Sequence, residues 1–214
     1  MKLILIAAFL MATANAAELR ITVYDKANLS KSVSQETFAE LRRIFRQSKI
    51  DVQLLAGDPS MDEASTMTYT EWPRRGHEEE VACRARRDIA LDIVGVAPPG
   101  LSSKVLGMAQ PLARTGLNVR IFNDHVRDAA IRQNRTHSNV LAHAIAHEIG
   151  HVLLRSSSHA DWGLMSSVWT AKEYGWMTNG GLFFTGNQSR KMLANLGGEG
   201  CLPAGLVLAG ASLK

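Results

Sequence analysis

The strongest constraint on the fold is the helical periodicity of the apolar residues over positions 138–154. Its apolar side chains recur at three- and four-residue steps, and Ser138 or Asn139 could cap its start. They are Val140, Leu141, Ile145, Ile149, Val152 and Leu153. This pattern predicts a helix packed on a core. The same segment contains His147-Glu148-Ile149-Gly150-His151, so ionisable groups share the helix with the apolar residues.

The HExxH pattern points to zinc chemistry. Two histidines at i and i+4 project from one face of a helix, so His147 and His151 can bind the same zinc ion. Zinc lowers the pKa of a bound water, and Glu148 follows the first ligand directly. We expect Glu148 to take a proton from the zinc-bound water and to deliver it to the leaving amine.

A third ligand is expected beyond the helix. A hydrolytic zinc site uses three protein ligands, whereas a structural site closes all four positions. We predict that His159 is the third ligand, because the serines before it can turn the chain back toward the helix. Asp161 is the competing candidate for this ligand. It could instead accept a hydrogen bond from the imidazole of a ligand. His143 and His147 are also spaced i, i+4. A helix rises about 1.5 Å per residue, so His143 lies about 12 Å from His151 along the axis and the two cannot bind the same ion. We therefore expect His143 to pack in the core or to line the cleft.

The first sixteen residues have the pattern of an export signal. A short basic start precedes an apolar run over residues 3–11, and Ala14-Asn15-Ala16 has small residues where signal peptidase cleaves. The run is about half of the ~20 residues that span a bilayer. We predict a signal peptide over residues 1–16, a single catalytic domain over 17–214, and a secreted or periplasmic protein without a stable membrane anchor. Because an exported protein enters a compartment that permits disulfides, Cys83 and Cys201 could form a disulfide or remain separate buried thiols.

The rest of the chain predicts several further strands and helices. Strands are expected at residues 19–24, 50–55, 89–96, 106–112 and 117–122, and Pro111 belongs at a sheet edge. A helix over 34–47 joins the first two strands in a parallel crossover. Residues 57–87 predict a long loop, 187–196 a short helix, and 202–213 an apolar tail that packs on the body.

Composition excludes collagen-like, disordered and polytopic membrane proteins. The chain has 214 residues, of which 46% are hydrophobic and 21% charged, as expected for one soluble domain. Its net charge of +4 comes from short arginine clusters mixed with acidic residues. Because no basic run occurs, nucleic acid is not an expected partner.

The motif and the residues after it resemble a known clan. His147 to His151, then His159, then Gly163-Leu164-Met165 are similar to the metzincin clan of zinc endopeptidases, and more closely to a group of secreted bacterial metalloproteases within it. The resemblance implies an α+β fold with a twisted mixed sheet of about four to five strands, a backing helix, an active-site helix and a small C-terminal part. It also implies that Met165 lies in a methionine turn beneath the metal.

Two positions depart from the clan's pattern. Leu154 stands where the pattern has a helix-ending glycine, and Ser157 stands where it has the third histidine. His159 is thus displaced by two residues, so the turn must be longer, and Arg155 or the serines must adopt it.

The resemblance also implies where a substrate lies. Metzincins align an extended peptide along the strand nearest the active-site helix, and the best candidates here are Gly107, Met108, Ala109 and Gln110. A tyrosine approaches the metal in some clan members, but Tyr174 is further past Met165, which favours packing.

The function predicted from these features is that of a secreted zinc metalloendopeptidase acting on peptides or proteins. Two alternatives remain at this point. One is a non-catalytic extracytoplasmic module that binds zinc or a partner, and the other is a zinc hydrolase of a non-protein amide. Glu148 favours catalysis, because a structural zinc site has no need of it.

Overall fold

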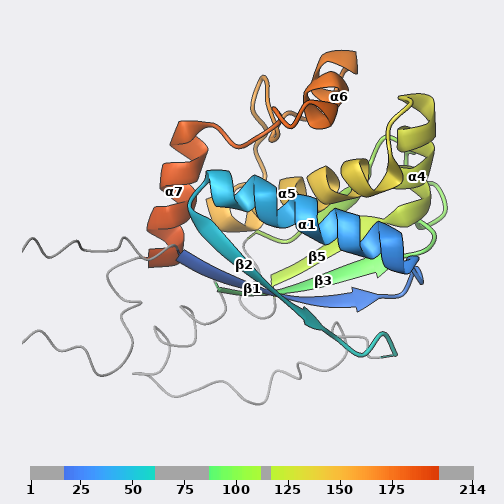
Figure 1. Ribbon diagram of the computed structural model, residues 1–214, viewed down its shortest axis with the longest axis horizontal. Coiled ribbons are helices and arrows are strands. Elements are labelled where there is room, and N and C mark those ends of the chain that lie inside the picture. Colours follow the sequence, from blue (N-terminus) through green and yellow to red (C-terminus); the bar gives the residue numbers. More distant parts are fainter. Residues whose placement is uncertain (1–16, 61–86, 112–116, 198–214) are drawn as a thin grey trace, which may run out of the picture.

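The computed structural model describes residues 17–60, 87–111 and 117–197. The predicted signal peptide, Cys83, Cys201, the tail over 202–213 and most of the predicted loop over 57–87 lie outside these residues. Within them, five strands form one sheet in the order β2-β1-β3-β5-β4 (Figure 1). The strands are β1 (Ala17–Asp25), β2 (Ile50–Ala56), β3 (Asp88–Val94), β4 (Gly107–Ala109) and β5 (Leu117–Phe122).

The sheet is mixed, which confirms the predicted α+β class. Strands β2, β1, β3 and β5 are parallel, and β4 pairs antiparallel with β5 at the edge. The strand predicted over 106–112 is shorter than expected and ends at Ala109, two residues before Pro111. Proline has no N–H to give to a ladder, so pairing stops before it.

Helix α1 (Lys31–Gln47) joins β1 to β2, as the strand, helix, strand pattern predicts. It begins three residues earlier than expected, because the Ser30 side chain caps it by accepting a hydrogen bond from the Val33 N–H. Its buried face presents Leu41, Ile44 and Phe45 to the core.

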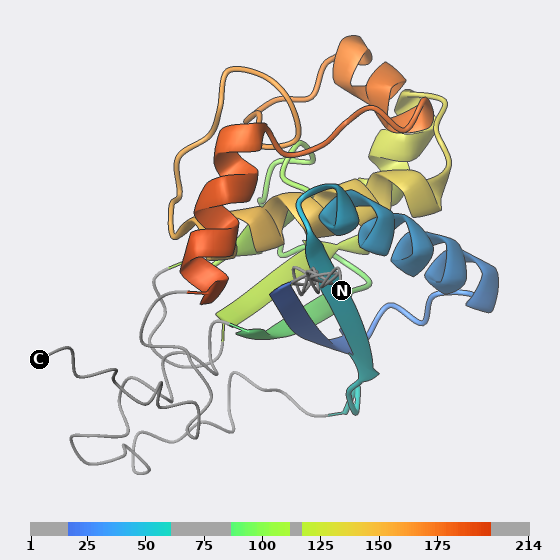
Figure 2. The same cartoon turned by 60° about the vertical axis from the view of Figure 1, so that its left-hand side comes forward.

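Helix α5 (His137–Leu154) lies at the centre of the molecule. It contacts α1, β4 and β5, and also α4 (Asn123–Arg132), α6 (Ala171–Thr178) and α7 (Gly186–Gly197). Figure 2 shows α1 and α5 on one face of the sheet, with α6 beyond them. Nearly every residue of α5 is therefore buried, whereas the sequence predicted a single apolar stripe.

Two helices were not predicted from the sequence. The buried face of α4 consists of Asn123, Val126, Ala129 and Ala130, which is too small and polar to give a clear apolar period. Helix α6 has Gly175 in its interior, and glycine is a poor helix former, so the sequence gives no clear helical signal there.

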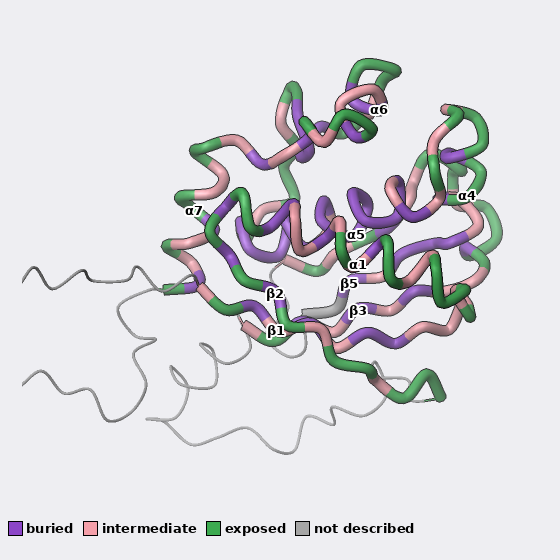
Figure 3. The backbone as a smooth tube through the Cα atoms, in the orientation of Figure 1, coloured by how far each residue is buried: buried purple, intermediate pink, exposed green. Residues whose placement is uncertain are grey.

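The core lies between one face of the sheet and helices α1 and α5 (Figure 3). Alternate residues of the strands point into it, among them Leu19, Ile21, Ile89, Leu91, Ile93, Val119 and Ile121. The opposite face carries ion pairs such as Arg20 with Asp88 and Arg120 with Asp92. In the part of the chain that the structure describes, no helix has the length and apolar character needed to cross a membrane.

Candidate metal centre

His147 and His151 bring two ring nitrogens together near the C-terminal end of α5. Both are buried, at 8% and 6% exposed, and their Nε2 atoms lie 3.1 Å apart. Two nitrogens bound tetrahedrally to one zinc, each at about 2.0–2.1 Å, lie about 3.3 Å from each other. The observed spacing therefore fits a shared metal ion.

A backbone carbonyl next to the Nδ1 atom of each histidine fixes which ring nitrogen carries the proton. His147 Nδ1 lies 2.7 Å from the Leu164 carbonyl oxygen, and His151 Nδ1 lies 2.8 Å from that of Ser156. A carbonyl only accepts, so both Nδ1 atoms carry the proton and donate. Burial lowers the pKa of His147 to about 4 and also lowers the pKa of His151, so both rings are neutral. Two bare Nε2 lone pairs thus face each other, as metal ligands do.

His159 completes the group from outside the helix. Its ring stacks on His147 with centroids 5.3 Å apart and stands perpendicular to the ring of His151 at 4.8 Å. One ligand atom from each of the three histidines lies within 4.8 Å of the others. His159 is exposed, whereas the two helical histidines are buried, so the site opens to solvent on the His159 side. This donor set of three imidazoles suits zinc.

A left-handed residue lets the chain turn toward His159. Arg155 caps α5 with φ 52° and ψ 45°, and so takes the turn that the sequence left to Arg155 or to the serines. Further on, a bridge between Ala160 and Ser166 closes a short loop, in which the Ala160 N–H donates to the Met165 carbonyl at 2.8 Å. Asp161 is exposed in this loop and is not part of the three-histidine group.

Met165 packs directly against the turn of α5 that carries the histidines. A Cβ added at Gly150 would lie 2.5 Å from Met165 Sδ and 2.7 Å from the Phe184 ring, so any larger residue would require these side chains to move. Met165 itself is 1% exposed. The structure therefore places this side chain against the helix backbone at Gly150, between His147 and His151, and its role in a methionine turn stays a prediction.

Glu148 lies between α5 and the edge strand. A Cβ added at Gly107 of β4 would lie 2.9 Å from Glu148 Cγ, so strand and side chain are in close contact. Burial raises the pKa of Glu148 to about 7. A carboxyl group with this affinity for protons can both accept and return one near neutral pH.

Strand β4 has one paired edge and one edge without a strand among the described residues. Gly107, Met108 and Ala109 pair with Ile121, Arg120 and Val119 of β5. Met108 is 48% exposed, and Gln110 follows the end of the strand. Three of the four predicted substrate-binding residues thus lie on an edge strand that contacts Glu148, and their role stays a prediction.

His143 and Tyr174 are both buried away from solvent. His143 is 0% exposed, and its Nδ1 bonds to the Asn139 carbonyl, which agrees with packing rather than with a cleft. Tyr174 lies in α6, where it is 7% exposed and its ring meets that of Trp169. Sequence reasoning expected packing for Tyr174, although at the surface.

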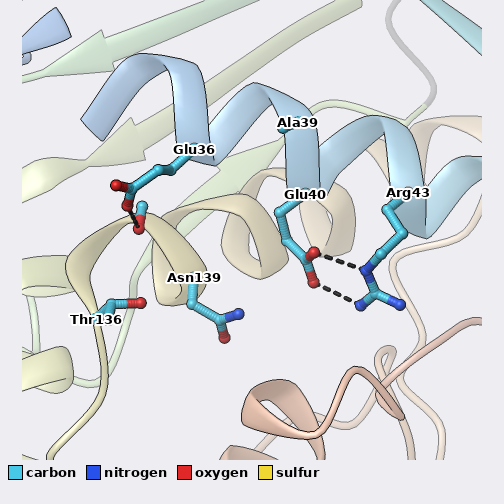
Figure 4. A pocket seen from close by; sticks show the side chains of 7 residues that line it. Glu36, Ala39, Glu40, Arg43, Thr136 and Asn139 are labelled. Carbon is cyan, nitrogen blue, oxygen red and sulfur yellow. Dashed lines mark hydrogen bonds and ion pairs between the residues drawn. The ribbon is translucent and has the colours of Figure 1, made fainter. Parts of the chain in front are cut away.

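A separate pocket lies between α1 and the first turn of α5 (Figure 4). It has a volume of about 390 Å³. Glu40 and Arg43 of α1 form a two-point ion pair at its wall, and the Ser138 hydroxyl donates to Glu36. None of the three histidines and no part of Glu148 lines it.

Sequence reasoning missed three groups that hold the centre in place. They are the backbone carbonyls of Leu164 and Ser156 and the side chain of Trp169, whose ring meets that of His147 at 5.7 Å. A carbonyl leaves no trace in a sequence pattern, because every residue has one. Nothing about a lone tryptophan after the motif indicated its partner either.

Comparisons with known proteins find the fold but no sequence relative. No protein-family model matches the chain, and no curated protein matches it. Among solved structures, it is similar to a zinc-dependent peptidase from Methanocorpusculum labreanum, with a TM-score of 0.51 and 13% identity over 80% of this chain and 99% of that one.

Two further structures resemble the chain more loosely, each with a TM-score of 0.49 and 13% identity. They are metalloproteinase-II from Bacteroides fragilis, covering 85% of this chain and 54% of that one, and archaemetzincin from Methanopyrus kandleri, covering 87% and 99%. At such identities a likeness shows the fold alone. The chain therefore shares its α+β fold with a solved zinc-dependent peptidase.

Proposed function

We propose that this chain is an exported zinc metallopeptidase of the metzincin type. The observation that carries the proposal is the convergence of three imidazoles at the helix that also carries the half-buried Glu148, the residue that follows His147. His147, His151 and His159 would hold the ion. Zinc bound there would act as a Lewis acid that polarises a peptide carbonyl and lowers the pKa of water.

Glu148 supplies the proton chemistry. Its carboxylate takes a proton from the attacking water as the water oxygen bonds to the carbonyl carbon. It then gives that proton to the amine nitrogen as the C–N bond breaks. The raised pKa of Glu148 suits both steps, because a group that titrates near neutral pH can accept and donate in turn.

Strand β4 orients the substrate. An extended peptide can pair with the edge of Gly107–Ala109 that faces no other strand in the described part of the chain, and so extend the sheet. Because Gly107 touches Glu148, such a peptide would run past the carboxyl group. Glycine at 107 also lets β4 lie close to both of its neighbours, since a Cβ there would meet the Arg120 carbonyl of β5 and Glu148 Cγ of α5, each at 2.9 Å.

The test compares Glu148→Gln with wild type for bound zinc and for cleavage of a quenched peptide library. The variant should keep zinc and lose activity by about 100-fold or more, as expected for a missing general base. Glu18→Gln, an exposed change on β1, is the matched control and should leave both unchanged.

Other results would point elsewhere. If wild-type protein binds zinc but cleaves no peptide, the alternative of a non-catalytic zinc-binding module is favoured. Cleavage of a cell-wall amide without cleavage of peptides would favour the non-protein hydrolase.

Export is the part of the proposal that rests on residues 1–16 alone. A bacterium expressing the full chain should release a protein that begins at Ala17, as measured by mass spectrometry of the periplasm and medium. An intact Met1 terminus found only in the cytoplasm would contradict it.

A further inference from the structure

We infer that Trp169 is a positioning residue for the metal ligand His147 and acts through the carbonyl of Leu164. The inference rests on the proposed function, because it assigns Trp169 a role at the same zinc site. Trp169 carries no donor atom for a metal, so its effect must pass through the groups that it holds.

The Leu164 carbonyl oxygen accepts two hydrogen bonds. His147 Nδ1–H donates to it at 2.7 Å, and the Trp169 indole Nε1–H donates to it at 3.1 Å. A carbonyl has two lone pairs, so the two donors fill its capacity. The indole therefore fixes the direction of the oxygen that sets the orientation of the His147 ring.

The Trp169 ring also limits the movement of the imidazole. It stands nearly perpendicular to the His147 ring, at 85°, with centroids 5.7 Å apart. His151 and His159 contact the same imidazole at 4.8 Å and 5.3 Å. His147 is thus held by one hydrogen bond and three rings, and Trp169 contributes to both restraints.

Trp169 is itself anchored by the start of α6. The next residue, Thr170, caps this helix, and its backbone N–H and hydroxyl both donate to the Glu173 carboxylate, at 2.8 Å and 2.5 Å. The ring of Tyr174 meets that of Trp169 at 6.1 Å and 89°. Helix α6, which carries none of the three histidines, thereby gains a role in supporting the metal centre.

The expected effect is on geometry rather than on ring basicity. Two donors that share one oxygen compete for its electron density, so the indole does not strengthen the bond to His147. It restrains the position of the carbonyl instead. Removing the N–H should let the Leu164 peptide tilt and the imidazole swing away from its place among the three ligands.

Trp169→Phe tests the inference, because it keeps an aromatic ring and removes the N–H. We expect zinc, measured by chelator competition, to bind about tenfold more weakly, at the low end for partners of metal ligands. The absorption bands of bound Co²⁺ should shift as well. The metal-free variant should unfold within about 4 °C of wild type, as for one lost hydrogen bond.

Trp176→Phe is the matched control. Trp176 is also a half-buried tryptophan, and its ring lies under Lys172 Nζ at 4.7 Å. This variant should bind zinc and Co²⁺ as wild type does. Equal zinc affinity in Trp169→Phe and wild type, or an equal loss in both variants, would overturn the role of Trp169. A wild type that binds no zinc would overturn the proposed function as well, so the two failures can be told apart.

If Trp169→Phe does not fold, a measurement on the wild-type protein still tests the inference. The indole N–H signal of Trp169 can be assigned in an NMR spectrum from single phenylalanine substitutions of the other three of the four tryptophans. It should exchange slowly with solvent and move on addition of zinc. Fast exchange with no response to zinc would contradict the inference.

Discussion

At the scale of single residues, His147 and His151 present two unprotonated nitrogens to each other across 3.1 Å. Such lone pairs repel unless a positive charge lies between them. Because each Nδ1–H is held by a carbonyl, neither ring can easily turn the other nitrogen inward. The local hydrogen bonds therefore select for a metal before any third ligand is considered.

The choice of third ligand gives the first prediction. His159→Ala should weaken zinc binding by more than about 100-fold, because even the loss of a partner of a ligand costs 10- to 100-fold. Asp161→Ala should leave the zinc dissociation constant unchanged, since Asp161 is exposed outside the group. Chelator competition measures both. The reverse result would make Asp161 the ligand.

His143 gives a prediction on pH. It is fully buried, its Nε2 lacks a hydrogen bond, and this atom lies 3.8 Å from Glu40, which is paired with Arg43. Burial lowers the pKa of His143 below its ordinary 6.5. The unfolded chain thus takes up a proton that the folded protein does not. The free energy of unfolding should fall as the pH drops below about 6.5 toward the folded pKa.

His143→Leu should remove this contribution. Urea unfolding of metal-free wild type and variant at about pH 7.5 and about pH 5 should show a smaller decrease in the variant. The other histidines titrate in both proteins, so the difference isolates His143. An equal or larger decrease in the variant would show that His143 is not neutral in the folded protein.

At the scale of elements, helix α5 ends at a strained residue. A left-handed conformation costs a residue with a side chain about 1–2 kcal/mol, whereas glycine adopts it freely but loses more entropy on folding, by about 0.5–1 kcal/mol. Arg155 has φ 52° in the cap of α5. The displaced third histidine requires this turn, since the chain must come back to the face of His147 and His151.

Arg155→Gly should therefore raise the free energy of unfolding by about 0.5–1 kcal/mol. Ser157→Gly is the matched control, because Ser157 is exposed and has no positive φ. It should lower stability slightly through the entropy of glycine. Urea unfolding measures both, and a destabilised Arg155→Gly would mean that the arginine side chain makes a contribution of its own.

At the scale of the whole molecule, the metal would join two segments of the chain. His147 and His151 lie in the central helix, and His159 lies in the loop that follows it. A ligand bound only by the folded state stabilises it, by about 4 kcal/mol at a thousand times its dissociation constant.

Removing zinc should accordingly lower the melting temperature by roughly 10 °C, at about 2–4 °C per kcal/mol for a chain of this size. Thermal unfolding with zinc and with excess chelator measures the shift. His147→Ala should show no shift. If the wild type melts at the same temperature in both conditions, the three histidines do not bind zinc tightly in solution.

Much of the framework follows from local patterns. The period of 3.6 residues places His147 and His151 one turn apart in any straight helix, so this pair was predictable without further knowledge. Alternation at two residues predicted β1 and β2 in the same way, and a nearly continuous apolar run predicted β3. Helices α4 and α6 were missed, because small or polar residues such as Ala129, Ala130 and Glu173 fill their buried faces.

What no local pattern could provide is the meeting of groups from different segments. The carbonyls of Leu164 and Ser156 set the tautomers, and Gly107 brings an edge strand against Glu148. Periodicity reports only which face of an element is apolar. The direction of a carbonyl, or the path of a loop, depends on packing between residues far apart in the chain. The sequence alone therefore identified His147, His151 and Glu148 as a candidate site on one helix, and the arrangement that orients them arises only in the folded protein.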